Sequence, residues 1–427
     1  MKTSVRFLLV ALVFAIFVAI GSLYMRFYVA PKTHGIILFI ANGYDISLIN
    51  RARLQAAKKG QSLHMDRLHQ VALLTTRGLN ENVADDAASA TALASGELSP
   101  NSIVGYNSLG RRLDTLIYAA QRAGRLTGLV TTNELTANTP TAFYSTKSKD
   151  PESAYQAAAE LIDTSNIDII LGGGKAYFTP ASVKNPYGRL DRRDLISEAD
   201  KRGYEIVMTR KALEAIPRWP QRRVFGLFAD HAFIYSSLTQ GTMDQPSLAD
   251  LTRRAIELMD LHLGGYFLVI DHGLIENASR RNLTQLALNE IAALDEAIRV
   301  AIAYAGRKSL ILCTSNFSLG SLDVRRSQLI ESTPPTEDIT YDWLSGPGGK
   351  LSSPHPSSPA TTLQDLYLRI QSPNDLALLT PQPAIHYSDE AEITSRPSWI
   401  ASRGFGEDYF RGFLDATEIY NLIVRLY

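Results

Sequence analysis

Two adjacent carboxylates at the start of an Ala-rich segment are the first residues of this chain that could carry chemistry. The segment ENVADDAASATALASG covers residues 81–96 and places Asp85 and Asp86 directly before a helix-forming run. An aspartate in this position can cap the helix, because its carboxylate accepts backbone N–H bonds and meets the positive end of the helix dipole. It could instead hold a metal ion or accept a phosphoryl group. The sequence favours capping.

Other polar residues lie at the ends of apolar runs that are typical of buried strands. Four of them are Asn42, Asn133, Asp271 and Asn316. Ligands bind outside the carboxyl ends of the strands in an open parallel sheet, so we expect these side chains to lie together. Asn42, Thr139, Asp86 and Asp271 offer the oxygen ligands that Mg²⁺ or Ca²⁺ prefers. A hydrogen-bonded network is the second interpretation, and it is favoured.

Strand and helix patterns alternate along the chain. Continuous apolar runs, typical of parallel strands buried on both faces, cover residues 34–43, 125–134, 167–174, 265–273 and 308–316. Helical patterns cover residues 113–124, 154–164, 248–262 and 283–306. This alternation predicts an α/β fold, a three-layer α/β/α arrangement around a doubly wound, largely parallel sheet.

The composition excludes several classes of protein. Lys+Arg and Asp+Glu number 43 each among 427 residues, so no net charge favours nucleic acid. The single cysteine, Cys313, excludes a disulfide framework.

The N-terminal segment predicts a membrane anchor. The 19 residues between Arg6 and Arg26 are uncharged, and as a helix they would be about 28 Å long, close to the hydrocarbon thickness of a bilayer. An uncleaved anchor is favoured over a cleaved signal segment because the small residues near its end form a poor cleavage site. We therefore expect an anchor over residues 1–29 and a domain over 30–427, held outside the cytoplasm in a periplasmic or extracellular position.

Two regions interrupt the alternation of strands and helices and are expected to be insertions. The first, near residues 180–245, is Arg-rich, and the second, near 333–395, begins with a Pro-, Gly- and Ser-rich stretch.

Seven segments, in order from about residue 35 to the end, resemble the alkaline phosphatases. They are IILFIANGYD, DDAASATALASG, GLVTTNELTANTPTAFYS, IDIILGGGKAYF, GGYFLVIDHGLIENASRRN, SLILCTSNFSLG and EDYFRGFLDATEIYNLI. The resemblance implies the three-layer fold of that family and, for its activity, two zinc ions, usually a magnesium ion, and a serine that accepts the phosphoryl group. The zinc ions would lower the serine pKa and hold the attacking and leaving oxygens.

Most of the positions that match the family's site carry other residue types. Asn42 stands where the first metal-bridging aspartate is expected, and Asp86 where the nucleophilic serine is expected. An Asp-His pair is replaced by Asn316 and Phe317. The last zinc-binding histidine would fall near residues 393–395, which hold none.

The second zinc position and the phosphate-gripping arginine are changed as well. Glu276 and Arg280 stand where an aspartate and a histidine are expected, and Lys149 or Asp150 where the arginine is expected. Arg280 either begins a solvated helix or replaces a lost cation by pairing with nearby carboxylates, and both interpretations stay open.

Only Thr139 and Asp271 still match residues of the family's magnesium site. The resemblance therefore implies a degenerate metal and nucleophile site, in which no zinc pair is expected and Mg²⁺ or Ca²⁺ is the remaining alternative. We expect a pseudoenzyme that binds or scaffolds. The alternatives are a phosphomonoesterase with a one-metal or aspartyl-nucleophile site, and a phosphate or anion receptor built on Lys149 and Arg280. Expected partners are the membrane and either a protein or a small phosphorylated ligand, with no nucleic acid; a homodimer stays open.

Overall fold

The structure is a computed structural model. It describes residues 2–24, 33–43, 46–79, 83–148, 150, 152–183, 185–239, 244–281, 283–319, 321–324, 341–344, 393–394 and 397–427.

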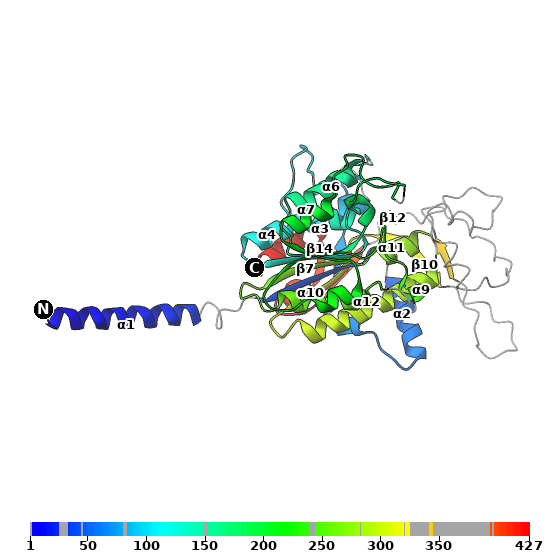
Figure 1. Ribbon diagram of the computed structural model, residues 1–427. Coiled ribbons are helices and arrows are strands. Elements are labelled where there is room, and N and C mark those ends of the chain that lie inside the picture. Colours follow the sequence, from blue (N-terminus) through cyan, green and yellow to red (C-terminus); the bar gives the residue numbers. More distant parts are fainter. Residues whose placement is uncertain are drawn as a thin grey trace, which may run out of the picture.

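A mixed, mostly parallel sheet forms the centre of the molecule (Figure 1). Its ten strands, within the described ranges, lie in the order β14-β2-β13-β8-β1-β7-β3-β4-β6-β5. Their bounds are β1 Gly35–Ile40, β2 Gln70–Thr75, β3 Leu126–Glu134, β4 Ile169–Gly173, β5 Tyr204–Val207, β6 Arg223–Leu227, β7 Tyr266–Asp271, β8 Leu310–Ser315, β13 Ser398–Gly404 and β14 Gly412–Asp415. Only β13 among these runs antiparallel to its neighbours, β8 and β2.

Helices cover both faces of the sheet. One face packs against α2 (Ile46–Lys58), α8 (Arg210–Ala215), α10 (Leu248–Met259), α11 (Gly273–Arg280) and α12 (Thr284–Tyr304). The other packs against α3 (Asp86–Ser95), α4 (Leu116–Arg122), α5 (Asn138–Ala142), α6 (Glu152–Asp163), α7 (Leu195–Lys201) and α14 (Ala416–Val424). Shorter elements are α9 (Ser236–Thr239), η2 (His64–Arg67), η3 (Lys175–Phe178), η5 (Glu407–Tyr409), β9 (Ser318–Leu319), β10 (Ser321–Val324), β11 (Tyr341–Leu344) and β12 (Ile393–Thr394).

The central strands are buried on both faces, as their continuous apolar runs predict. In β1, Ile36 and Leu38 contribute to one core cluster, while Ile37 and Phe39 contribute to the other. This alternation follows from the two-residue period of a strand, which sends successive side chains to opposite faces. The three-layer α/β prediction is confirmed, and each of the five predicted strands and four predicted helices is present.

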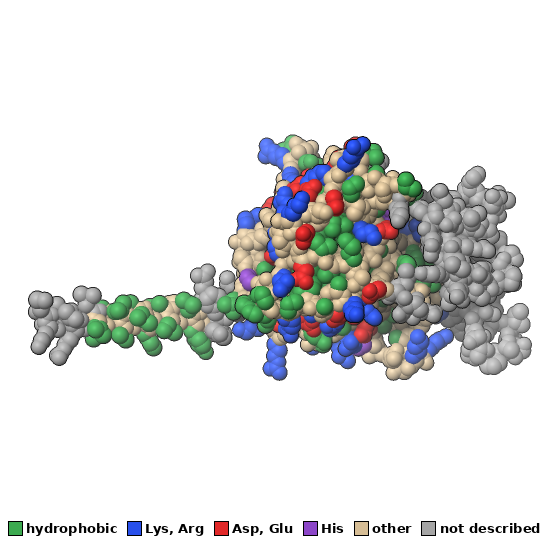
Figure 2. Space-filling model, viewed as in Figure 1, with side chains coloured by type: hydrophobic (Ala, Val, Ile, Leu, Met, Phe, Trp, Pro, Cys, Tyr) green, Lys and Arg blue, Asp and Glu red, His purple; other side chains and the backbone are tan. Residues whose placement is uncertain are grey.

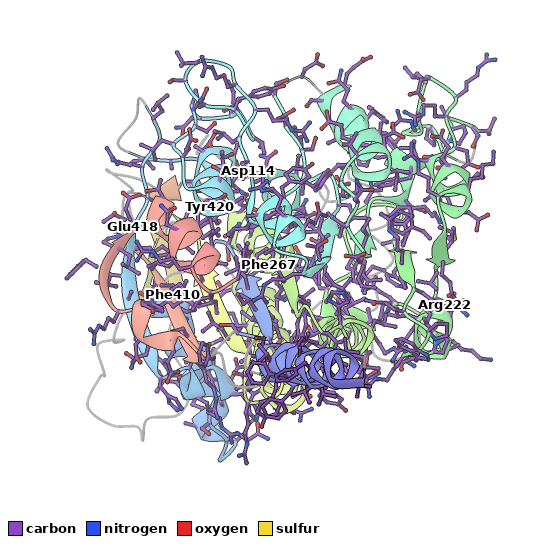
Figure 3. All side chains as sticks on the ribbon, turned by 90° about the vertical axis from the view of Figure 1, so that its left-hand side faces the viewer. Asp114, Arg222, Phe267, Phe410, Glu418 and Tyr420 are labelled. Carbon is purple, nitrogen blue, oxygen red and sulfur yellow. The ribbon has the colours of Figure 1, made fainter. Side chains whose placement is uncertain are left out.

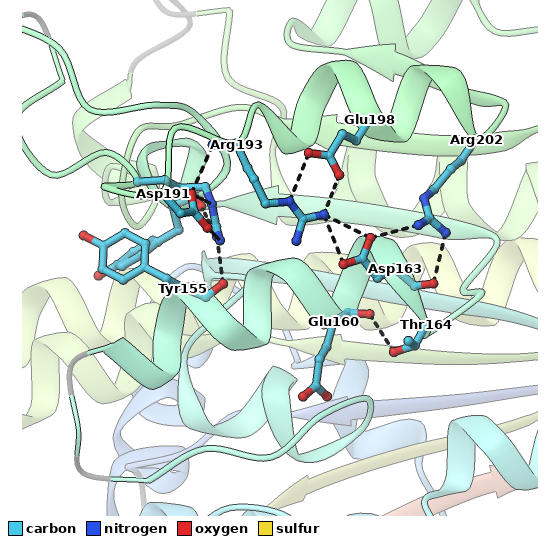
Figure 4. A network of polar contacts seen from close by, with 10 residues as sticks. Tyr155, Glu160, Asp163, Thr164, Asp191, Arg193, Glu198 and Arg202 are labelled. Atoms are coloured by element: carbon cyan, nitrogen blue, oxygen red, sulfur yellow. Dashed lines mark hydrogen bonds and ion pairs between the residues drawn. The ribbon is translucent and has the colours of Figure 1, made fainter.

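The segment near residues 180–245, expected to be an insertion, contributes β5 and β6 to one end of the main sheet. A network of ion pairs connects helix α7, which belongs to this segment, with helix α6 (Figure 4). Arg193 lies 3.1 Å from Asp163 and also pairs with Glu198, and Arg202 lies 2.9 Å from the same Asp163. Two guanidinium groups therefore share one carboxylate at the junction of the helices. The other expected insertion, near 333–395, lies almost wholly outside the described residues.

The N-terminal helix α1 covers Lys2–Tyr24 and stands away from the sheet. Its apolar side chains are exposed: Phe7 is 80% and Phe17 72% accessible. In the described stretches of the chain, no helix combines the length and hydropathy needed to cross a membrane.

Candidate functional site

The polar strand ends meet at the carboxyl edge of the sheet, where Asn42 follows β1, Asp271 ends β7 and Asn316 follows β8. The backbone N–H of Asn316 donates to Asn42 Oδ1 at 3.1 Å. All three residues are buried, with exposures of 1% each. The prediction that the strand-end residues gather at one end of the sheet is confirmed for these three of the four named from the sequence.

Asn42 also connects the sheet to helix α5. Its amide Nδ2 donates to Thr139 Oγ1 at 2.9 Å, and Thr139 is itself buried. Both polar atoms of the Asn42 side chain are therefore engaged by protein groups. Each polar atom of this buried amide therefore has a protein partner, as is usual for buried polar groups.

Asp85, rather than Asp86, caps α3. Its carboxylate accepts from the Ala88 backbone N–H at 2.9 Å and from Ser102 Oγ at 3.0 Å. The helix begins one residue later, at Asp86. The capping prediction is thus confirmed for Asp85, and Asp86 is left for other contacts.

The Asp86 carboxylate points toward α5. Its Oδ2 accepts from Asn138 Nδ2 at 2.8 Å, and its Oδ1 accepts from the Ala87 backbone N–H at 3.0 Å. Asn138 was not singled out from the sequence, although it precedes Thr139 directly. A neutral amide and a backbone N–H therefore hold this carboxylate.

A cation that the sequence reasoning missed lies near Asp86. Lys147 Nζ donates to the Thr136 carbonyl at 2.8 Å, on a segment fixed by the bridge between Val104 and Lys147. Burial lowers the pKa of Lys147, while the charges of Glu134 and Asp86 act in the opposite direction. The residue predicted for this role, Lys149, lies outside the described residues.

The Asp271 carboxyl is enclosed by the sheet. Its Oδ2 accepts from Thr131 Oγ1 at 2.7 Å. Burial raises the pKa of Asp271 to about 6, against the Thr131 hydrogen bond, which lowers it. This carboxyl therefore takes up a proton at a higher pH than an exposed aspartate does.

Glu276 and Arg280 form an ion pair along one turn of α11. Arg280 Nε donates to Glu276 Oε1 at 2.8 Å, and the side chains are 25% and 13% exposed. Burial raises the pKa of Glu276 to about 7 despite the opposing charge of Arg280. The Arg280 guanidinium also lies over the ring of Phe317, 5.7 Å from its centroid. Of the carboxylates considered from the sequence as partners of Arg280, Glu276 forms an ion pair with it.

The side-chain amide of Asn316 lies buried at the site without hydrogen-bond partners in the described part of the chain. Neither its Nδ2 nor its Oδ1 has a hydrogen-bond partner within the described residues, although the side chain is buried. The neighbouring β9 pairs with β12, so Leu319 lies opposite Ile393. An unpaired buried amide costs about 1–3 kcal/mol, so a ligand with one donor and one acceptor would be favoured there.

His272 belongs to the structural framework behind the site. Its Nδ1 lies 2.9 Å from Thr132 Oγ1, and its Nε2 lies 3.0 Å from the Glu290 carbonyl. Glu290 in turn accepts from the backbone N–H and the hydroxyl of Ser236. Both ring nitrogens of His272 therefore form hydrogen bonds with protein groups.

These residues do not fit a zinc pair. Zinc sites rely on histidine, cysteine and carboxylate donors. Here the carboxyl groups of Asp86, Asp271 and Glu276 are bonded to Asn138, Thr131 and Arg280. The other groups at the site are the amides of Asn42 and Asn316 and the Thr139 hydroxyl. The described part of the chain contains no group of three or more His, Cys, Asp or Glu residues placed to hold a metal ion.

The comparisons with known proteins agree with the fold. The family model for alkaline phosphatase matches residues 33–342. Alkaline phosphatase 4 of Bacillus subtilis is 30% identical over 250 residues, and the repressible alkaline phosphatase of Saccharomyces cerevisiae is 29% identical over 335. The matches cover 57% and 71% of this chain but only 51% and 58% of those relatives.

Solved structures superpose over most of the chain. The alkaline phosphatase of the Antarctic bacterium TAB5 has a TM-score of 0.70 at 20% identity, covering 92% of this chain and 98% of that one. The Thermus thermophilus alkaline phosphatase has a TM-score of 0.71 at 20% identity, covering 92% and 91%. Given the family match over residues 33–342, this chain belongs to the alkaline phosphatase family.

Proposed function

We propose that this chain is an exported, membrane-tethered member of its family that acts by binding or scaffolding, without zinc-dependent hydrolysis of phosphomonoesters. The single observation that carries this proposal is the way the strand-end residues engage one another. Asn42 is bonded to Thr139 and Asn316, Asp271 to Thr131, and Glu276 to Arg280. These side-chain groups, which could otherwise bind a metal ion, form hydrogen bonds or an ion pair with other protein groups.

The nucleophile position supports the same proposal. Asp86 presents a carboxylate where the family resemblance leads us to expect a serine hydroxyl. An incoming phosphate dianion would meet this negative charge, and Asn138 and the Ala87 N–H offer only neutral donors against it. Lys147 is a cation whose charge interacts with that of Asp86, and its burial disfavours the charged form. Phosphoryl transfer to Asp86 would need more positive charge than these residues supply.

The amide of Asn316, which has no hydrogen-bond partner among the residues that the structure describes, supports binding as the remaining role. An asparagine amide donates through Nδ2 and accepts through Oδ1, so its natural partner is another amide or a hydroxyl-bearing group. A partner segment or a small polar ligand that reaches the strand ends would restore both hydrogen bonds.

The tether is proposed from α1. Its apolar side chains are exposed to solvent, and exposing them costs free energy in proportion to their area. Insertion of this helix into a bilayer, with the charged residues Lys2 and Arg6 at its start, removes that cost.

The test is p-nitrophenyl phosphate hydrolysis by the full chain in detergent, at alkaline pH, with added Zn²⁺ and Mg²⁺ and with a chelator control. A metal-dependent family member, assayed in parallel, shows that the conditions support turnover. We expect no turnover and no change of melting temperature with the chelator. Metal-dependent turnover would support a remodelled phosphomonoesterase, and metal-independent stabilisation by inorganic phosphate would support an anion receptor.

A further inference from the structure

The edge of the sheet opposite the candidate site exposes large apolar side chains from several separate loops. They are Trp219 (71% exposed), Leu261 (52%), Leu263 (83%), Tyr304 (45%) and Tyr409 (50%). The first four precede β6, β7 and β8, and Tyr409 follows β13, which runs antiparallel and so ends at the same edge. We call these five residues and the loops that carry them the strand-start face.

Hydrogen bonds link neighbouring segments of this face in two places. Arg218 Nε, beside Trp219, donates to the Glu257 carbonyl at 3.3 Å, four residues before Leu261. The Phe405 N–H donates to the Ser309 carbonyl at 3.1 Å, which brings the Tyr409 turn beside the start of β8.

This face carries exposed basic side chains that no carboxylate pairs with in the described part of the chain. Arg218, Arg307 and Lys308 are exposed and make no ion pair with any residue that the structure describes. Of the nearby acidic groups, Glu205 lies 2.9 Å from Arg222, and Asp260 lies 3.4 Å from the His34 ring. The exposed carboxylates Asp200 and Asp408 lie beside β5 and after β13. Figure 3 views this side of the molecule, with Arg222 labelled.

The chain enters the domain at this same face. The His34 N–H donates to the Lys308 carbonyl at 2.8 Å, and the His34 carbonyl accepts from the Tyr266 N–H at 2.9 Å. Thr33 follows Tyr24 by nine positions, a length of chain that reaches about 30 Å when extended. Figure 2 shows the apolar surface of α1 on this side of the molecule and exposed apolar and basic side chains on the adjoining side of the domain.

We propose that the strand-start face docks on the surface of an anionic phospholipid bilayer. Trp219, Tyr304 and Tyr409 have the amphipathic rings that suit the headgroup region. The leucines add buried apolar area, and the unpaired cations attract anionic headgroups. The inference rests on the proposed tether, which brings a bilayer within reach, and it leaves the strand-end site facing away from the membrane.

The test uses the fluorescence of Trp219 in the full chain, mixed with vesicles of phosphatidylcholine and phosphatidylglycerol that carry bromine near the headgroup. The Trp219→Phe variant gives the emission of the other two tryptophans, so the difference spectrum belongs to Trp219. We expect quenching of that difference spectrum by the brominated lipid, together with protection from aqueous iodide. Vesicles of phosphatidylcholine alone should quench less.

Charge reversal gives the matched comparison. The variant with Arg307→Glu and Lys308→Glu should lower the docking equilibrium by more than about thirtyfold, since each lost cation near an anionic surface weakens attraction about fivefold and each added carboxylate is repelled. The control variant with Lys58→Glu and Lys59→Glu makes the same charge change at the end of α2 and should dock normally.

The outcomes separate the two proposals. If the chain co-sediments with vesicles but Trp219 stays open to iodide, the tether stands and docking of this face is overturned. If the chain does not co-sediment, both proposals fail. Equal loss of quenching in the two charge variants would also overturn the docking proposal, because it would reflect net charge and not this face.

Discussion

Replacing Glu276 by glutamine should flatten the pH dependence of stability. Burial raises the pKa of Glu276 from 4.5 to about 7 in the folded state. The folded protein then binds this proton more tightly than the unfolded chain does. The resulting contribution to stability is complete below pH 4.5 and is lost as pH rises through about 7.

The size of the effect follows from the same two pKa values. A difference of about 2.5 pKa units corresponds to about 3 kcal/mol, an upper limit because water reaches part of the pair. Glu276→Gln keeps the size of the side chain and its acceptor for Arg280 while removing the titration. Relative to the wild type, the variant should gain up to about 3 kcal/mol between pH 5 and pH 8.

Urea unfolding at several pH values measures this difference directly as a change in the free energy of unfolding. Glu296→Gln is the matched control, because Glu296 is exposed and paired with Arg299, which lowers its pKa. The control should not gain stability as pH rises from 5 to 8. If Glu276→Gln and the wild type keep the same slope over this range, the carboxyl is not protonated by burial and the reasoning is refuted.

Three further changes test other contacts. Arg280→Ala should lower the free energy of unfolding by about 2 kcal/mol at pH 8 and by less at pH 5, because Glu276 is protonated at pH 5. Urea unfolding measures both losses, and an equal loss at the two pH values would refute the pairing. Asp85→Ala should lower the melting temperature through a loss of about 1–2 kcal/mol, because the cap of α3 and the Ser102 contact both disappear, and an unchanged melting curve would contradict this. Asp86→Ser should not create p-nitrophenyl phosphate hydrolysis with added zinc, and measurable turnover would show that metal ligands remain.

The sequence predicts the centre of the fold well and its ends poorly. β1, β7 and β8 are continuous apolar runs buried on both faces, and such runs are easily recognised. β5 and β14 are four-residue strands at the ends of the sheet, only partly buried. In strands this short, the alternation of apolar and polar residues is too brief to distinguish a strand from a loop. For this reason the sequence pattern predicts an insertion in the Arg-rich segment around β5.

The candidate site is predicted in the same uneven way. Asn42, Asp271 and Asn316 could be placed together because parallel strands end at one edge. The roles of Lys147 and Asn138 could not be predicted, since they depend on a loop crossing and on the direction of side chains. The choice between Asp85 and Asp86 as helix cap depends on a one-residue difference in the start of α3, a difference that sequence patterns do not resolve.

The charge balance of the site explains how the fold tolerates its unusual residues. A buried carboxylate needs a metal ion, a cation or a proton. Burial raises the pKa of Asp271 to about 6 and that of Glu276 to about 7, so protons supply part of the neutralisation, while Arg280 supplies the rest. The amides of Asn42 and Asn316 add no charge of their own. Protons and Arg280 can therefore offset buried negative charge at the strand ends without a divalent cation, and this supports the binding role proposed above.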